Sequence, residues 1–289
     1  MLFDALPPRP RPFVLRPGVV LALVAGMIWS SGVACLWTNE SALIFQTRRS
    51  RIFRPVASEG LVALRTTDGI RLDALSLTHD SASPYWILFC PPSGRTIHGH
   101  MRVQLKSLHA AGFNVFAFDY RGFGRNQGMP SEAGVYEDAI TAYRHLTDQL
   151  GVAPPRIILA GRSLGSAVAV DLATRVPSGG LFLLSAIDSV PARGSRLYPW
   201  APVSLLASQR FDSLAKAPRV TVPVLQVHAP KDWLVPLDAA RALFERFPGR
   251  KVMLELPGGH NDVGFADESL GRALGQFWAD RASSPLRAW

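Results

Sequence analysis

The chain has 289 residues, of which 48% are hydrophobic and 18% are charged. These fractions are typical of a globular protein and exclude a chain that is disordered over most of its length. The net charge is +9, and part of the excess lies near the N-terminus, where basic residues flank an apolar segment. This placement favours attraction to a membrane surface over nucleic-acid binding, since the sequence has no nucleic-acid motif and no basic patch interleaved with aromatic residues.

Residues 19–37 contain no charged side chain and predict a single transmembrane helix after an N-terminal tail of residues 1–18. A helix of this length rises about 28 Å, close to the thickness of the hydrocarbon core of a bilayer. Two alternatives stay open: a signal peptide cleaved after Ala34, and a lipoprotein modified on Cys35. The flanking arginines favour a cytoplasmic N-terminus and an exported domain, and therefore a single-pass membrane protein of that orientation.

Residues 38–60 are interpreted as a basic, proline-containing linker, and residues 61–289 as one domain of alternating strands and helices. Nearly purely apolar strands separated by helices predict an α/β fold, with a mostly parallel sheet covered by helices on both faces. The first two strands, with Asp68-Gly69 between them, predict an antiparallel hairpin. The expected strands are 62–65, 71–76, 85–90, 113–118, 156–160, 181–186, 223–228 and 251–256, and the expected helices are 101–111, 132–150, 163–175, 238–247 and 268–281.

The segment 188–222 lies between two expected strands and has no strong periodic pattern. It contains several prolines and aromatic residues. We interpret it as a short lid over an active site and call it the lid below.

A candidate nucleophile lies in the run Gly161-x-Ser163-x-Gly165, which follows an expected strand and precedes an expected helix. A sharp strand-to-helix turn crowds the backbone, so glycines are needed on both sides of the serine, and the turn raises the serine oxygen above the sheet. It also leaves the amide of Leu164 at a helix N-terminus, where an oxyanion is stabilised. This setting favours a nucleophile over a serine that occurs in the turn by chance.

A serine nucleophile needs a base, and only His228 and His260 follow Ser163 in the chain. His260 lies in a loop directly after the last expected strand, where the base of a strand-to-helix nucleophile belongs. His228 ends a strand and is interpreted as a structural hydrogen-bonding residue. We therefore expect His260 to be the base.

The acid that orients the base is expected between the serine and the histidine in chain order. Asp232 follows the strand 223–228 closely and is the first candidate. Asp238 opens the next expected helix and is better explained as a helix cap. Asp262, close to the base in sequence, is the reserve candidate.

From about residue 58 to its end, the chain resembles the α/β-hydrolase superfamily, and within it the membrane-anchored serine hydrolases with a small lid, which include lipase-, esterase- and serine-aminopeptidase-like members. The motifs that carry the resemblance are Asp119-Tyr120-Arg121-Gly122-Phe123-Gly124, the run 161–165, the run 228–236 and Gly259-His260-Asn261-Asp262. The resemblance implies an α/β-hydrolase fold and a serine hydrolase that acts on ester, thioester or amide bonds. Asp119 and Arg121 are interpreted as structural.

One departure from the family concerns the second oxyanion donor. Relatives often carry His-Gly after the strand that corresponds to 85–89, and the next residue donates its amide. Here Pro92 falls at the donor position, and proline has no N–H. Either Ser93 or a neighbouring amide takes over, or the oxyanion hole is weaker; Ser93 is our candidate.

The remaining polar residues give no sign of a cofactor or a metal. No G-x-G-x-x-G run precedes a helix, and His98, His100 and His109 have no accompanying cysteine or carboxylate pattern. Cys35 and Cys90 lie in different segments and are not expected to form a disulfide.

Two functions follow as hypotheses: a serine hydrolase, and a catalytically weak hydrolase-fold protein that acts as a membrane-bound binding or scaffold partner. The first is favoured because packing alone requires no combination of Ser163, Asp232 and His260. The anchor and lid favour an acylated or lipid-linked substrate. An aminopeptidase would need an acid to hold the substrate amine, and the candidates are Asp188, Asp212 and Glu132.

Overall fold

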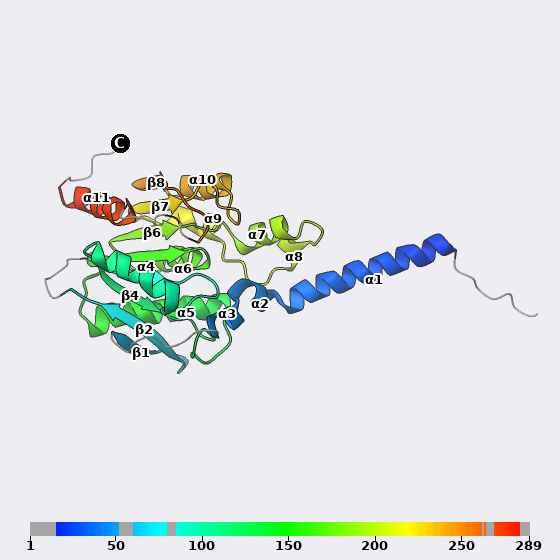
Figure 1. The fold of residues 1–289 in the computed structure, drawn as a ribbon, viewed down its shortest axis with the longest axis horizontal. Helices are drawn as coiled ribbons and strands as arrows, with labels where there is room; N and C mark the ends of the chain where they lie inside the picture. Colours follow the sequence, from blue (N-terminus) through cyan, green and yellow to red (C-terminus); the bar gives the residue numbers. More distant parts are fainter. Residues whose placement is uncertain (1–15, 52–59, 80–84, 262, 264–268, 284–289) are drawn as a thin grey trace, which may run out of the picture. The chain divides into compact units, whose positions relative to one another are not determined.

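The computed structural model describes residues 16–51, 60–79, 85–261, 263 and 269–283. The chain separates into two units, Met1–Asn39 and Glu40–Trp289, each described here by itself (Figure 1). The second unit holds the sheet and all but one of the helices that the described residues form.

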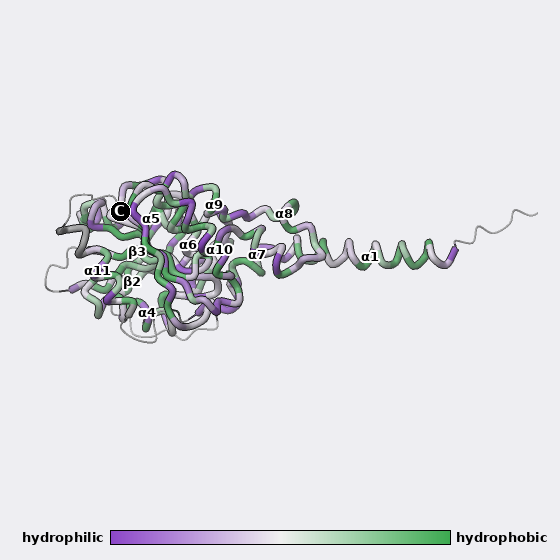
Figure 2. The backbone as a smooth tube through the Cα atoms, turned by 90° about the horizontal axis from the view of Figure 1, so that it is seen from above, coloured by the Kyte–Doolittle hydropathy of each residue, from purple (hydrophilic) through white to green (hydrophobic). Residues whose placement is uncertain are grey.

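The first unit contains one helix, α1 (Pro17–Thr38), which starts with a proline at its first position, where the missing N–H costs no hydrogen bond. Figure 2 shows α1 mainly in green and white, the colours of hydrophobic and neutral residues. Its length and mean hydropathy of 2.2 suffice to cross a membrane, and a signal sequence near the N-terminus would pass the same test. The apolar N-terminal helix predicted over residues 19–37 is therefore present.

The second unit is built on an eight-stranded sheet of order β1-β2-β4-β3-β5-β6-β7-β8. β2 pairs antiparallel with β1 and with β4, and all other pairs are parallel, which confirms the expected lead-in hairpin and the mostly parallel sheet. The strands are β1 (Leu61–Arg65), β2 (Arg71–Leu77), β3 (Trp86–Cys90), β4 (Asn114–Phe118), β5 (Ile157–Arg162), β6 (Gly180–Leu184), β7 (Val224–His228) and β8 (Lys251–Glu255).

Helices cover both faces of this sheet, as expected from its apolar strands. Side chains alternate across β5, so that Ile157 and Leu159 enter one hydrophobic cluster and Ile158 and Ala160 the other. The first cluster includes residues of α5 (Glu132–Arg144), α6 (Leu164–Ala173) and α10 (Leu237–Glu245), and the second includes residues of α4 (Gly99–Ala110) and α11 (Ser269–Ser283). α5 continues into a π-helical turn, His145–Gln149.

Residues 40–51 form two short helices, α2 (Glu40–Phe45) and α3 (Thr47–Arg51), within the second unit. Phe45 is fully buried, packs edge-on against Phe211, and accepts a 2.9 Å hydrogen bond from the amide of Gly94 on its carbonyl oxygen. This stretch, assigned from sequence to the linker 38–60, is thus part of the folded unit. Helices this short show no periodic pattern, so the buried contacts that hold them, Phe45 and Ser50 among them, give no signal in the sequence.

The lid segment leaves the sheet after β6 and returns at β7. It contains α7 (Val190–Leu197), α8 (Val203–Leu206), α9 (Ser213–Lys216) and a 3₁₀ turn, Ala217–Arg219. Its start is joined to α9, because the amides of Ser213 and Leu214 donate to the carbonyl oxygen of Asp188. The segment is a closed excursion from the sheet, and its role as a lid stays a prediction.

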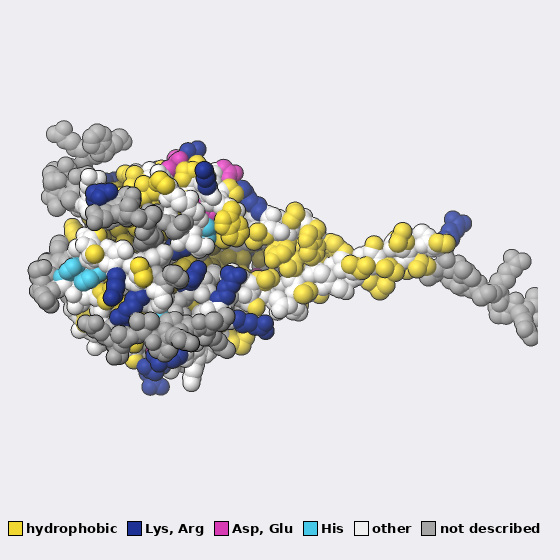
Figure 3. Space-filling view, in the orientation of Figure 1, with side chains coloured by type: hydrophobic (Ala, Val, Ile, Leu, Met, Phe, Trp, Pro, Cys, Tyr) yellow, Lys and Arg dark blue, Asp and Glu magenta, His cyan; other side chains and the backbone are white. Residues whose placement is uncertain are grey.

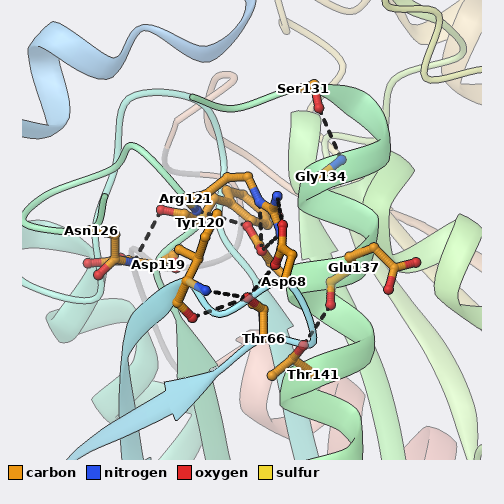
Figure 4. Close-up of polar contacts among 12 residues, drawn as sticks. Thr66, Asp68, Asp119, Tyr120, Arg121, Asn126, Ser131, Gly134, Glu137 and Thr141 are labelled. Carbon is orange, nitrogen blue, oxygen red and sulfur yellow. Dashed lines mark hydrogen bonds and ion pairs between the residues drawn. The ribbon is translucent and has the colours of Figure 1, made fainter. Parts of the chain in front are cut away.

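The run Asp119–Gly124 after β4 has structural partners. Arg121 donates to Asp138 on α5. It also donates to Asp68 in the hairpin turn, which Figure 4 shows in close-up. Asn126 donates to the carbonyl oxygen of Asp119, and one Asp119 carboxylate oxygen accepts the amide of Ile97 at 2.7 Å. The motif therefore ties the hairpin, β4 and α5 together.

Candidate active site

Ser163 occupies the turn between β5 and α6 with φ 51° and ψ −122°, a conformation that a residue with a side chain adopts only under strain. A Cβ atom on Gly161 would overlap the backbone of Gly165, and one on Gly165 would overlap the carbonyl oxygen of Cys90. Both glycines are therefore required by direct backbone contact. The strained turn fixes the direction of the serine side chain.

The structure brings Ser163, His260 and Asp232 together although they are far apart in sequence. His260 Nε2 lies 2.9 Å from Ser163 Oγ, and His260 Nδ1 lies 2.8 Å from Asp232 Oδ2. All three residues are buried. This is the geometry of a serine whose proton can pass to an imidazole that a carboxylate orients.

The loop after β7 holds the carboxylate of Asp232 in this position. Its second carboxylate oxygen accepts the amides of Leu234 at 2.9 Å and Val235 at 2.8 Å. Burial raises the pKa of Asp232, but the hydrogen bonds from His260 and from these amides outweigh burial, so the pKa lies below its ordinary value. The carboxyl is ionised at neutral pH.

The residues that were alternatives in the sequence take other positions. His228 is fully buried and donates from Nε2 to the carbonyl oxygen of Val235, and burial lowers its pKa. It supports the loop of Asp232, in agreement with the structural interpretation. Asp238 is an exposed residue in the first turn of α10, whose N-cap is Pro236, so the expectation that it caps the helix is wrong. Asp262 lies outside the described residues.

The two expected oxyanion donors lie on neighbouring segments. Leu164 is the first residue of α6, so its N–H has no intrahelical acceptor. The loop after β3 passes against the same turn, since Gly165 packs on the carbonyl groups of Cys90 and Pro91. Within the described part of the chain, the amide of Ser93 donates no hydrogen bond, whereas its neighbour Gly94 donates to Phe45.

Arg162, the residue directly before Ser163, has contacts that the sequence did not reveal. Its side chain is buried and donates to Gln104 Oε1 and Asn261 Oδ1, both at 2.9 Å, and to the carbonyl oxygen of His260 at 3.3 Å. It therefore links the nucleophile turn to α4 and to the loop of the base. The motif allows any residue at this position, so the sequence carries no signal for these contacts. Only the buried position of the arginine in the fold reveals them.

Arg193 of α7 connects the lid to the loop of Asp232. It makes a buried ion pair with Asp188 at 2.9 Å and donates to the carbonyl oxygen of Leu234 at 3.0 Å. The preceding residue in that loop, Trp233, is 71% exposed and lies edge-on to the His260 ring at 6.4 Å. An exposed aromatic residue therefore lies beside the base.

The three acids considered for amine binding each have a structural partner. Asp188 pairs with Arg193, Asp212 accepts the amide of Ala215 as the N-cap of α9, and Glu132 accepts the amides of Arg210 and Phe211. The lid is therefore fastened at its base by carboxylates that the sequence offered as substrate ligands.

Among the described residues, no group of three or more histidine, cysteine, aspartate or glutamate side chains could hold a metal ion. His98 precedes α4, and His109 stacks on His79 with ring centroids 3.9 Å apart. The side chain of His100 lies outside the described residues. Cys35 is exposed on α1 and Cys90 is buried at the end of β3, both as free thiols.

The sheet order, the strained serine turn and the helices on both faces define a hydrolase of α/β architecture. A family model for serine aminopeptidases, S33, matches residues 98–209. The chain is 35% identical over 256 residues to the uncharacterized protein Rv2307c of Mycobacterium tuberculosis, covering 86% of this chain and 89% of that protein. It is 30% identical to alpha/beta hydrolase domain-containing protein 17B of Xenopus laevis, covering 74% of this chain and 73% of that protein.

Solved structures share the fold. The esterase Pf2001 of Pyrococcus furiosus superposes with a TM-score of 0.65 at 18% identity, covering 80% of this chain and 95% of that one. An α/β hydrolase of Vibrio vulnificus superposes with a TM-score of 0.62 at 19% identity, covering 97% of this chain and 98% of that one. The chain belongs to the α/β-hydrolase superfamily. These relatives support hydrolase activity in general.

Proposed function

We propose that the protein is a serine hydrolase that cleaves ester, thioester or amide bonds through an acyl-enzyme on Ser163. The observation that carries the proposal is the pair of contacts from His260, 2.9 Å to Ser163 Oγ and 2.8 Å to Asp232 Oδ2. Such a relay on a strained strand-to-helix turn has no evident packing purpose, because a buried polar cluster contributes little to stability compared with apolar side chains of the same volume.

In the first half of the reaction, Ser163 Oγ attacks the substrate carbonyl carbon and its proton passes to His260 Nε2. His260 Nδ1–H donates to Asp232, which holds the ring in the productive tautomer and stabilises the imidazolium. His260 then gives the proton to the leaving group, and the acyl group stays on Ser163. In the second half, His260 takes a proton from water as its oxygen attacks the acyl carbon. The bond from that carbon to Ser163 Oγ then breaks, His260 returns the proton to Oγ, and the acid product leaves.

The oxyanion formed in both halves is assigned to the amides of Leu164 and Ser93. A free N–H at a helix N-terminus favours negative charge, and the glycine contacts of the turn keep the loop after β3 against it. Pro92 cannot donate, so Ser93 replaces the donor that relatives carry one position earlier. Each such donor typically contributes about 10²–10³ in rate.

Arg162 is assigned a positioning role. It holds the carbonyl oxygen of His260 and the side chain of Asn261, so it fixes the chain at the base and directly after it. Ser185 donates to the same carbonyl oxygen at 3.3 Å. The base is therefore oriented through its backbone as well as through Asp232.

An ester or thioester is the preferred substrate class. The acids that could hold the amine of a peptide substrate are bound to lid residues, whereas Trp233 offers an aromatic surface beside His260. We further propose that α1 anchors the protein in a membrane, which would present lipid-linked acyl groups to the site. The apolar character of α1 supports this assignment over a cleaved signal sequence, because the apolar run continues past the candidate cleavage position.

A second candidate function is a catalytically weak binding or scaffold protein, favoured by Pro92 alone. Steady-state hydrolysis of p-nitrophenyl acetate and butyrate by the full chain in detergent distinguishes the two. The enzyme hypothesis predicts turnover that is lost in Ser163→Ala and in His260→Ala and kept in Ser178→Ala, a serine in the loop between α6 and β6. Equal rates in wild type and Ser163→Ala would contradict it.

A further inference from the structure

The middle of the lid carries large hydrophobic side chains in contact with solvent. Leu197, Trp200, Leu205 and Leu206 are all exposed, Leu205 to 83%. Figure 3 shows hydrophobic side chains gathered over the part of the second unit that carries α7 and α8. We call these four residues the lid tip. Large apolar side chains gathered on a solvent-exposed face mark an interaction site.

The charged residues within the segment that carries the lid tip are all basic. Residues 189–211 include Arg193, Arg196 and Arg210 but no aspartate or glutamate. Arg210 is exposed, and Arg196 reaches only a surface aspartate, whereas Arg193 is buried in its ion pair. Apolar side chains with flanking arginines are the pattern of a segment that lies in the interface of an anionic bilayer.

A second observation concerns the chain that follows α1. Glu40 follows the end of α1 by two residues, and its carboxylate accepts hydrogen bonds from the amides of Ser208 at 2.8 Å and Gln209 at 3.0 Å and from the hydroxyl of Ser208. Ser208 in turn follows Leu206 by two residues. If α1 spans a membrane, the residue at its exit is bonded to the chain that leaves the lid tip.

The same segment is connected to the site. Arg193 of α7 donates to Leu234, next to Trp233, which lies edge-on to His260. The lid is therefore hydrogen-bonded to the loop that carries Trp233, the aromatic residue beside the base.

We infer that the lid tip rests in the headgroup and acyl boundary of the membrane that holds α1, and that the substrate is an acyl ester or thioester resident in that membrane. The inference rests on the proposed function for the substrate and on α1 as a membrane anchor for the docking. Glu40 is the tether: it fastens the lid to the point where the chain leaves the bilayer.

The docking is tested with the full chain reconstituted in vesicles of phosphatidylcholine and phosphatidylglycerol, with and without brominated acyl chains. In a Cys35→Ser background, Leu205→Cys is labelled with an environment-sensitive fluorophore, and Leu150→Cys serves as the matched control. Leu150 is an exposed leucine at the end of the π-helical turn after α5. It lies shortly before β5 in the chain, whereas Ser163 directly follows β5, so the two residues belong to opposite ends of this strand. Burial raises the pKa of the Cys90 thiol, so Cys90 stays unlabelled.

Docking predicts that brominated lipid quenches the fluorophore at position 205 by more than about twofold over that at position 150, since a leucine of the interface lies about 5–10 Å into the headgroup and acyl boundary. Equal quenching at the two positions overturns the inference, and so does failure of the protein to float with the vesicles. Fluorophosphonate labelling of the same samples reports the proposed function independently, because docking does not require an active serine.

The substrate class is tested by the ratio of turnover on a vesicle-resident p-nitrophenyl palmitate to turnover on soluble p-nitrophenyl acetate. The double variant Leu205→Ser and Leu206→Ser is expected to lower this ratio about tenfold, because two leucines leave the interface. Leu150→Ser is expected to keep it. An unchanged ratio in the double variant overturns the assignment of a membrane-resident substrate.

Discussion

The turn at Ser163 and the lid differ in how their positions are fixed. The turn is held by backbone against backbone: Gly165 touches the carbonyl oxygen of Cys90, and Ser163 donates its amide to Leu184. The lid is held by carboxylates at its base, Asp188 and Glu132 among them, and its tip carries exposed leucines. The rigid part suits a reaction that needs atoms placed within tenths of an ångström, and the lid suits an apolar partner of variable shape.

The largest expected effect is the fall in kcat when Asp232, the acid of the relay, is replaced by a neutral residue. Asp232→Asn keeps the shape of the side chain but favours the wrong tautomer of His260, so kcat is expected to fall by about 10⁴. Asp238→Asn, a surface acid on the following helix, should leave kcat unchanged. Steady-state kinetics on p-nitrophenyl butyrate measures both. Equal kcat values for the two variants would show that Asp232 takes no part in the relay.

The lid should respond to loss of its buried ion pair mainly through stability. Arg193→Met leaves Asp188 buried without its partner and is expected to lower the free energy of unfolding by about 3 kcal/mol. The double variant Arg193→Met and Asp188→Leu should recover most of that loss, since neither charge remains. Denaturant unfolding followed by circular dichroism measures both values. A double variant as unstable as the single one would show that the pair is not the fastening of the lid.

The link between the turn and the base is tested through Arg162. Arg162→Gln loses contacts to the carbonyl oxygen of His260 and to Asn261, so kcat is expected to fall about 10²-fold with KM nearly unchanged, because the contacts orient the base and not the substrate. Arg162→Lys should recover part of the rate. Arg219→Gln, an exposed arginine, is the control. A fall confined to KM would contradict the positioning role.

The smallest effect concerns His228 and pH. Burial lowers the pKa of His228, so the unfolded chain takes up the proton first and the folded state loses stability as the pH falls below about 6.5, the ordinary histidine value. Wild type should therefore lose up to about 1 kcal/mol more than His228→Gln between pH 7.5 and pH 5.5. Unfolding curves at the two pH values give the difference. A larger loss in the variant would reverse the sign and contradict the assignment.

The sheet was predictable because its strands are nearly pure apolar runs. The expected strand 156–160, for example, contains the uninterrupted apolar run Ile157–Ala160. A strand that is buried on both faces of the sheet requires such a run. The glycines around Ser163 were equally predictable, since a crowded turn excludes side chains. His260 and Asp232 followed from their position after strands.

The contacts of Phe45, Arg162 and Glu40 were not predictable. Each contacts residues distant in the chain, and none belongs to a periodic pattern: Phe45 ends a short apolar run ahead of a basic stretch, and Arg162 fills a variable motif position. Glu40 is a single acid beside an apolar helix. Only the fold brings Ser208 and Gln209 to its carboxylate.

The most direct test is the mass of the protein after exposure to a fluorophosphonate. If His260 activates Ser163, intact-mass spectrometry should show one adduct on the wild type, and peptide mapping should place it on Ser163. Ser163→Ala should show none, and Asp232→Asn should label far more slowly. An adduct formed at the same rate on Ser163→Ala, or no adduct on the wild type, would contradict the proposed relay.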